Sequence, residues 1–166
     1  MRTRTLRFGA VLASALALPA AAQEGTFVVR SMTPETATAA AQAALEHCRK
    51  NGFQVAVAVV DRSGVLQAFV RDRLAGPHTV EVATHKAWTA ASFKVATAVL
   101  ATETQAGRPL SGLRSLPRVI AVGGGLPMEV GGALLGAIGV SGAPVGDADE
   151  ACAKAGLRAV ADALEF

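Results

Sequence analysis

The sequence feature that most constrains the fold is a run of glycines at positions 136, 139 and 142, with small and branched apolar residues between them. Glycine loses more backbone freedom than any other residue in a helix, so this spacing disfavours a helix. It is typical of a strand whose backbone is approached closely by another part of the protein or by a flat ligand. Three further glycines at 123–125 favour a bend between strands.

Residues 1–22 have the pattern of a secretory signal peptide. Three arginines within the first seven residues precede an apolar stretch at 8–18 and alanines at 20–22. The apolar stretch is too short for a permanent membrane anchor. We therefore expect residues 23–166 to be a periplasmic or secreted protein with no membrane anchor after cleavage.

The charge balance argues against a nucleic-acid partner. The chain has 16 Lys+Arg and 13 Asp+Glu residues, but three of the arginines lie in the predicted signal peptide. Residues 23–166 are then close to neutral, so neither nucleic acid nor an acidic membrane is an expected partner. Their length suits a single domain with its own core.

Cys48 and Cys152 are the only cysteines. Export would place them in an oxidising compartment. They lie near the end of the first predicted helix and the start of the last one, so a disulfide forms if these helices pack side by side in opposite directions. Two buried free thiols are an equally good interpretation, and the sequence leaves both open.

The order of predicted elements indicates an α+β fold. Thr33, Pro34 and Glu35 are typical of a helix start, and the patterns predict helices over 34–50, 78–93, 97–104 and from about 147 to 164. Strands are predicted over 53–60, 65–70, 119–122, and on both sides of 131–132, the last of them over 134–141. Grouped strands favour an antiparallel sheet covered by helices over alternating βαβ units.

Several short segments together resemble one known family. In chain order they are AVVD at 58–61 with Gly64, KAWTA at 86–90, GGLP at 124–127, GAIGVSG at 136–142, and Asp149 with AG at 155–156. This set is similar to the GlcG/HbpS family, which includes the C-terminal domain of PduO-type proteins. The resemblance covers nearly all of residues 23–166.

The resemblance implies a three-layer α-β-α domain with a profilin-like, five-stranded antiparallel sheet. It also implies homo-oligomers and the binding of haem, with a corrinoid as the alternative tetrapyrrole. In an oligomeric family the glycine run at 136–142 is expected to pack against a neighbouring subunit, although a helix could also approach it. Residues 71–76 depart from the usual Arg-Met-Asp-Gly-Ala pattern, so ligand contacts of that loop are not carried over.

One predicted helix face carries candidate metal ligands. His78, Glu81 and His85 are spaced three and four residues apart, so they project from the same side. Such a set could hold a transition metal, and either histidine could be an axial haem ligand. The alternative is a solvated face with an ordinary ion pair. His85 is the better candidate because it precedes the KAWTA segment.

Other residues could contact a bound haem. Thr97 is a candidate weak oxygen contact to iron, with a helix cap as its alternative role. Lys86 and Arg71 could bind haem propionates or a small carboxylate, or be ordinary surface charges. Apolar contacts to the macrocycle would come from Trp88, Phe93 and Leu100.

These observations favour an exported, oligomeric haem- or tetrapyrrole-binding protein that acts in sequestration or sensing. No catalysis is assigned, because no nucleophile–base pair or closed metal set can be assembled. The alternative is an enzyme or accessory protein for a small organic acid of glycolate-type metabolism, using Asp61, Lys86 and His85. A structural oligomer without a small ligand is the third interpretation.

Overall fold

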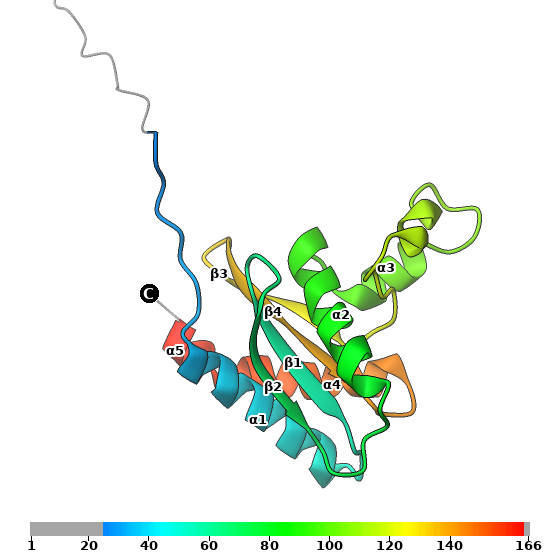
Figure 1. Ribbon diagram of the computed structural model, residues 1–166, viewed down its shortest axis with the longest axis horizontal. Helices are drawn as coiled ribbons and strands as arrows, with labels where there is room; N and C mark the ends of the chain where they lie inside the picture. Colours follow the sequence, from blue (N-terminus) through cyan, green and yellow to red (C-terminus); the bar gives the residue numbers. More distant parts are fainter. Residues whose placement is uncertain (1–24, 165–166) are drawn as a thin grey trace, which may run out of the picture.

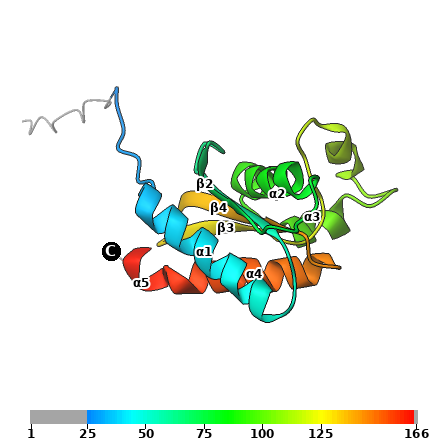
Figure 2. The same cartoon turned by 60° about the horizontal axis from the view of Figure 1, so that its bottom comes forward.

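The computed structural model describes residues 25–164, so the predicted signal peptide lies outside the described residues. The fold is α+β: an antiparallel sheet of four strands with helices on both faces (Figures 1 and 2). The strand order is β2-β1-β4-β3. No helix within residues 25–164 is long and apolar enough to cross a membrane.

Two central strands form the middle of the sheet. They are β1 (Ala56–Asp61) and β4 (Ala133–Ser141), while β2 (Leu66–Arg71) and β3 (Gly125–Val130) form the edges. The five apolar residues of β1 are all buried because helices cover both sides of this strand. The nearly continuous apolar pattern of the sequence has this physical origin.

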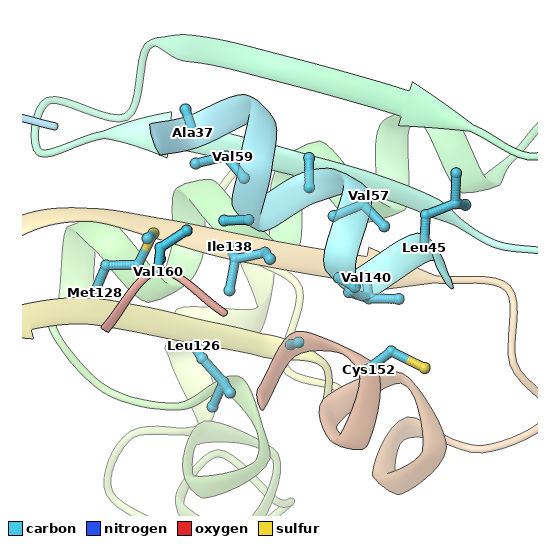
Figure 3. Close-up of a cluster of buried hydrophobic side chains, with 14 of the residues drawn as sticks. Ala37, Leu45, Val57, Val59, Leu126, Met128, Ile138, Val140, Cys152 and Val160 are labelled. Atoms are coloured by element: carbon cyan, nitrogen blue, oxygen red, sulfur yellow. The ribbon is translucent and has the colours of Figure 1, made fainter. Parts of the chain in front are cut away.

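Helices α1 (Pro34–Lys50) and α4 (Gly146–Ala159) cover one face of the sheet, and the short α5 (Ala161–Leu164) follows α4. Thr33 begins α1 as predicted, since its Oγ1 accepts a hydrogen bond from the Thr36 amide. The core between these helices and the sheet is built from branched and long apolar side chains (Figure 3), among them Val57, Val59, Leu126, Met128, Ile138 and Val140.

The cysteines form a disulfide between α1 and α4. Cys48 and Cys152 are separated by 104 residues, and their Cα atoms lie 5.5 Å apart. Both are buried in the core between the helices and the sheet. The disulfide alternative of the sequence is therefore correct, and no free cysteine occurs within residues 25–164.

Helix α2 (Thr79–Phe93) covers the opposite face through small residues. The second core cluster is made mostly of alanines from β1, β4 and α2: Ala56, Ala58, Ala137, Ala83, Ala87, Ala90 and Ala91. A Cβ on Gly139 would collide with the Ala83 carbonyl oxygen and lie 2.5 Å from the Ala87 amide nitrogen. Gly139 thus lets α2 approach the sheet closely.

The prediction that the glycine run packs against a neighbouring subunit is wrong for Gly136 and Gly139. A Cβ on Gly136 would collide with the Val60 carbonyl oxygen and with the Met32 side chain, and Gly139 meets α2. Both close approaches come from within the same chain. Residues three apart on a strand face opposite sides of the sheet, so the two glycines serve different layers.

The predicted strand over 119–122 does not form, which leaves four strands instead of five within residues 25–164. The physical reason is that threonine hydroxyls of helices bind this backbone. The Ile120 amide donates to Thr89 Oγ1 at 3.0 Å, and Thr97 Oγ1 donates to the Val122 carbonyl at 2.6 Å. Between α2 and residue 119 the chain forms α3 (Thr97–Glu103) and the 3-10 helix η1 (Ser111–Ser115). The profilin-like comparison stays a prediction.

Candidate functional site

Helix α2 carries the predicted metal ligands, but the structure does not assemble them into a metal site. His78 occupies the N-cap position and makes no capping hydrogen bond; a Cβ on Gly76 would lie 2.7 Å from its ring. Glu81 and the partly buried His85 follow on the helix. Within residues 25–164, no three His, Cys, Asp or Glu side chains lie close enough together to hold a metal ion.

The aromatic part of the predicted site lies against a hairpin turn. A Cβ on Gly64, which has φ of +78°, would be 2.7 Å from Trp88 Cδ1. The Arg118 guanidinium lies over the Trp88 ring, 4.8 Å from its centroid, which is a cation–π distance. His85 precedes Trp88 by three residues and so lies on the same side of α2. We call His85, Trp88 and Arg118 the α2 outer face.

Lys86 is turned into the protein. Its Nζ donates to Asp149 Oδ2 at 2.8 Å and to the Val140 carbonyl oxygen at 2.9 Å, and its side chain is only 2% exposed. The other carboxylate oxygen of Asp149 accepts from the Ala143 amide at 2.9 Å. In this structure Lys86 therefore faces Asp149 and not the propionate or small carboxylate that the sequence suggested.

Burial is the main influence on the carboxylate of this pair. It raises the pKa of Asp149, and the nearby Lys86 ammonium opposes the rise without cancelling it. A Cβ on Gly124 would lie 2.9 Å from Lys86 Nζ and 2.7 Å from Asp149 Cβ, so no larger residue fits beside the pair. The KAWTA, GGLP and glycine-run segments and Asp149 thus meet at one ion pair.

Thr97 is fully buried and its hydroxyl is used inside the chain. It donates to the Val122 carbonyl and accepts from the Gly125 amide at 2.8 Å. The N-cap position of α3 belongs to Ala96, so the helix-cap alternative is wrong. A contact from Thr97 to an iron atom stays a prediction, and it would require the surrounding chain to move, because the hydroxyl is fully buried.

The acidic and basic residues near the β2 end are also engaged. The Arg71 guanidinium donates to the Ala75 carbonyl. Asp72 is buried, and Arg49 binds it with Nε and a terminal nitrogen at 2.7 and 3.1 Å. This hydrogen-bonded guanidinium lowers the pKa of Asp72. Arg71 is exposed, so it stays a candidate for binding a haem propionate with the nitrogens that do not contact Ala75.

Asp61, a residue of the small-acid hypothesis, holds a turn together. Its Oδ1 accepts from the amides of Ser63 and Val65 at 2.8 and 3.0 Å. This is the local role that an aspartate has most often at a hairpin. With Asp61 in the turn and Lys86 bound to Asp149, the polar cluster expected of Asp61, Lys86 and His85 is not assembled.

Two hollows lie away from these residues. An apolar groove of about 380 Å³ runs between β3 and the α4–α5 segment. A polar pocket of about 340 Å³ lies where the two hairpin turns meet the end of α2. Neither is lined by a predicted site residue. The second is lined by residues that the sequence analysis did not select: Val28, Arg30, Arg62, Lys94, Gly132, Ala133 and Leu134.

Two features of the candidate site escaped sequence reasoning. Asp149 stands among the family segments of the sequence, but its ion pair with Lys86, 63 residues away, gives no local signal. Arg118 gave no signal, because its position over Trp88 depends on how the 118–125 segment is held by Thr89 and Thr97.

The fold and these segments define a member of the HbpS-like family. The family model described as "Haem degrading protein HbpS-like" matches residues 32–158, and the chain belongs to this family. The solved structure of a double mutant of Streptomyces reticuli HbpS is 39% identical, with a TM-score of 0.77; the match covers 87% of this chain and 97% of that one.

Two further relatives carry information about ligands. The crystal structure of a PduOC:heme complex is 31% identical, with a TM-score of 0.74, and the match covers 78% of this chain and 94% of that one. The corrinoid adenosyltransferase PduO of Salmonella typhimurium is 36% identical over 106 residues, which are 63% of this chain. The chain spans only 32% of the length of that relative.

Proposed function

We propose that this protein binds haem and that the α2 outer face is the binding surface. The observation that carries the proposal is the likeness over 94% of the PduOC chain to a structure that contains haem. The likeness to HbpS at 39% identity supports the same ligand class. The corrinoid alternative has weaker support, because the corrinoid adenosyltransferases are matched over only 32% of their length.

The residues of the α2 outer face fit the chemistry of haem. His85 offers an imidazole, which is a common axial ligand of haem iron. Trp88 offers a partly buried aromatic ring. Arg118, which lies over one face of that ring, offers a guanidinium that can pair with a propionate. A bound haem would supply a redox-active iron centre; the role of these side chains is to bind and orient it. Catalysis is not part of the proposal.

Export and self-association are also proposed. The signal-peptide pattern of residues 1–22 supports export to the periplasm or secretion. Exposed apolar side chains on and around α3 and η1 support a homo-oligomer, since apolar clusters at a surface mark interaction sites; they are Val99, Leu110, Leu116 and Val122. A role in haem sequestration or sensing would fit such an exported protein.

The test is a haemin titration of the purified protein followed by absorbance. We expect a saturable, stoichiometric Soret shift that weakens by about tenfold or more in His85→Ala. The matched control is His47→Ala, which removes a histidine from α1 on the other face of the sheet. Thr97→Ala is titrated beside them, because a loss of haemin affinity in that variant and not in His85→Ala would indicate that Thr97 contacts the iron.

Two outcomes would contradict the proposal. A weak signal that does not saturate and is equal in all variants would show non-specific haemin binding. An equal loss in His85→Ala and His47→Ala would show that the histidine of the α2 outer face has no special role. Far-ultraviolet circular dichroism of each variant separates loss of binding from loss of folding.

A further inference from the structure

The polar pocket at the turn end of the sheet is built from four separate segments. Arg62 comes from the β1–β2 hairpin, Lys94 from the end of α2, and residues 132–134 from the β3–β4 hairpin. Residues 28 and 30 of the N-terminal segment complete it. Its volume of about 340 Å³ is within the range of small-molecule sites.

The pocket has a single sign of charge. Three of its lining residues, Arg30, Arg62 and Lys94, carry a positive charge, and none of its lining residues is acidic. The acidic residue that precedes Arg62 is Asp61, whose carboxylate is bound to the backbone of its own turn. Arg30 has a further interaction in the chain, so Arg62 and Lys94 are the residues to test.

Lys94 is held in an unfavourable backbone conformation. It has φ of +53° and follows the last residue of α2, a position at which glycine or asparagine is the usual choice. A lysine in this conformation is less stable than a glycine would be, and its ammonium group lies beside the pocket. The carbonyl end of α2 is also a favourable place for a cation.

We propose that this pocket binds a small multivalent anion, a molecule that carries two or more negative charges on carboxylate or phosphate groups. Two cations from different segments suit an anion with two or more negative charges better than one with a single charge, because each guanidinium or ammonium makes charge-assisted hydrogen bonds of its own. None of its lining residues belongs to the α2 outer face, and the proposal places small-acid recognition on residues other than Asp61, Lys86 and His85.

The test is calorimetric titration of the purified protein with citrate, inorganic phosphate and acetate at low ionic strength. Citrate or phosphate binds saturably with one-to-one stoichiometry, and the tighter of the two tells which anionic group the site prefers. Acetate, with one carboxylate, binds at least about tenfold more weakly. Affinity falls as salt is added, because the cations are at the surface.

Two variants locate the binding. Arg62→Gln and Lys94→Asn each weaken citrate or phosphate binding by about tenfold, and asparagine tolerates the left-handed backbone of position 94. The control Lys50→Gln removes an exposed lysine at the end of α1 and leaves affinity unchanged. Equal affinity in wild type and both variants, or no saturable binding of either multivalent anion by wild type, overturns the proposal.

Discussion

Lys86 Nζ and Asp149 Oδ2 lie 2.8 Å apart in the interior, and they join the two helical layers of the protein. Lys86 belongs to α2 on one face of the sheet, and Asp149 belongs to α4 on the other (Figure 2). The pair meets beside Gly124, where the missing side chain leaves room for it. Segments that the sequence resemblance singled out are therefore explained by architecture.

Removing one member of this pair should be costly. Lys86→Met leaves the buried Asp149 carboxylate without its cation and should lower the free energy of unfolding by about 3–5 kcal/mol. The double variant Lys86→Met/Asp149→Leu should lose less than the sum of the single variants, because it leaves no uncompensated charge. Urea unfolding of Lys86→Met, Asp149→Leu and the double variant, each compared with wild type, measures these losses. Additive losses would show that the two residues do not interact.

The disulfide should stabilise the folded chain. It closes a loop of 104 residues between α1 and α4, so Cys48→Ala/Cys152→Ala should unfold about 2–4 kcal/mol more easily than the oxidised protein. Reductant should destabilise the wild type under the same conditions and leave the double variant unchanged. The same free energy of unfolding for the wild type with and without reductant, when the reductant is added to the urea-unfolded protein, would argue that the bond is absent in solution.

The space above Gly139 is taken by α2. Gly139→Ala should lower the free energy of unfolding by about 1–3 kcal/mol, because the new methyl group meets the Ala83 carbonyl and the Ala87 amide. Gly112→Ala is the control, since a Cβ there meets nothing within 4 Å. Thermal unfolding of both proteins compares them. Similar effects at the two positions would show that α2 does not pack here as described.

The hydroxyl of Thr97 should stabilise the segment that leads into β3. Thr97→Val leaves the Gly125 amide and the Val122 carbonyl without this partner and should cost about 1–3 kcal/mol. Thr97→Ser keeps the hydroxyl and should cost less. Hydrogen exchange at the Gly125 amide should speed up in the valine variant alone. Unchanged exchange there would mean that the hydroxyl does not hold this segment.

Acid should weaken the contact between Asp72 and Arg49. The hydrogen-bonded guanidinium lowers the pKa of Asp72 in the folded state below its value in the unfolded chain. The stabilisation is therefore complete above the unfolded pKa and is lost as pH falls through the folded one. Asp72→Asn should be less stable than wild type at neutral pH, and the difference should shrink in acid. A difference that is constant with pH would exclude this linkage.

Much of the fold was predictable because it follows from local patterns. The helix start at Thr33 and Pro34, the central strand over 56–61 and the final antiparallel strand carry their signals within a few residues. The strand expected over 119–122 failed because its backbone partners are Thr89 and Thr97, which are remote in sequence.

The candidate site was less predictable, because side-chain direction depends on packing. The sequence allowed Lys86 to be a surface cation, yet its side chain is buried because Asp149 binds its ammonium group and Gly124 leaves room for it. The pocket of Arg62 and Lys94 escaped notice because its members come from turns that meet only in the folded sheet. Neither the burial of Lys86 nor the pocket can be predicted from the local sequence pattern.

The alanine-rich packing of α2 has a consequence for how the protein opens. Small side chains bury little apolar area, so each contact of this helix contributes less than the valine, leucine and isoleucine contacts on the α1 side. No disulfide ties α2 to the sheet, whereas one staples α1 to α4. For α2 the buried Lys86–Asp149 ion pair is the tie to α4, so partial unfolding that frees α2 should follow the breaking of this pair while the stapled half stays intact. The side of the molecule that carries the proposed haem face then depends on one ion pair where the other side has a covalent bond.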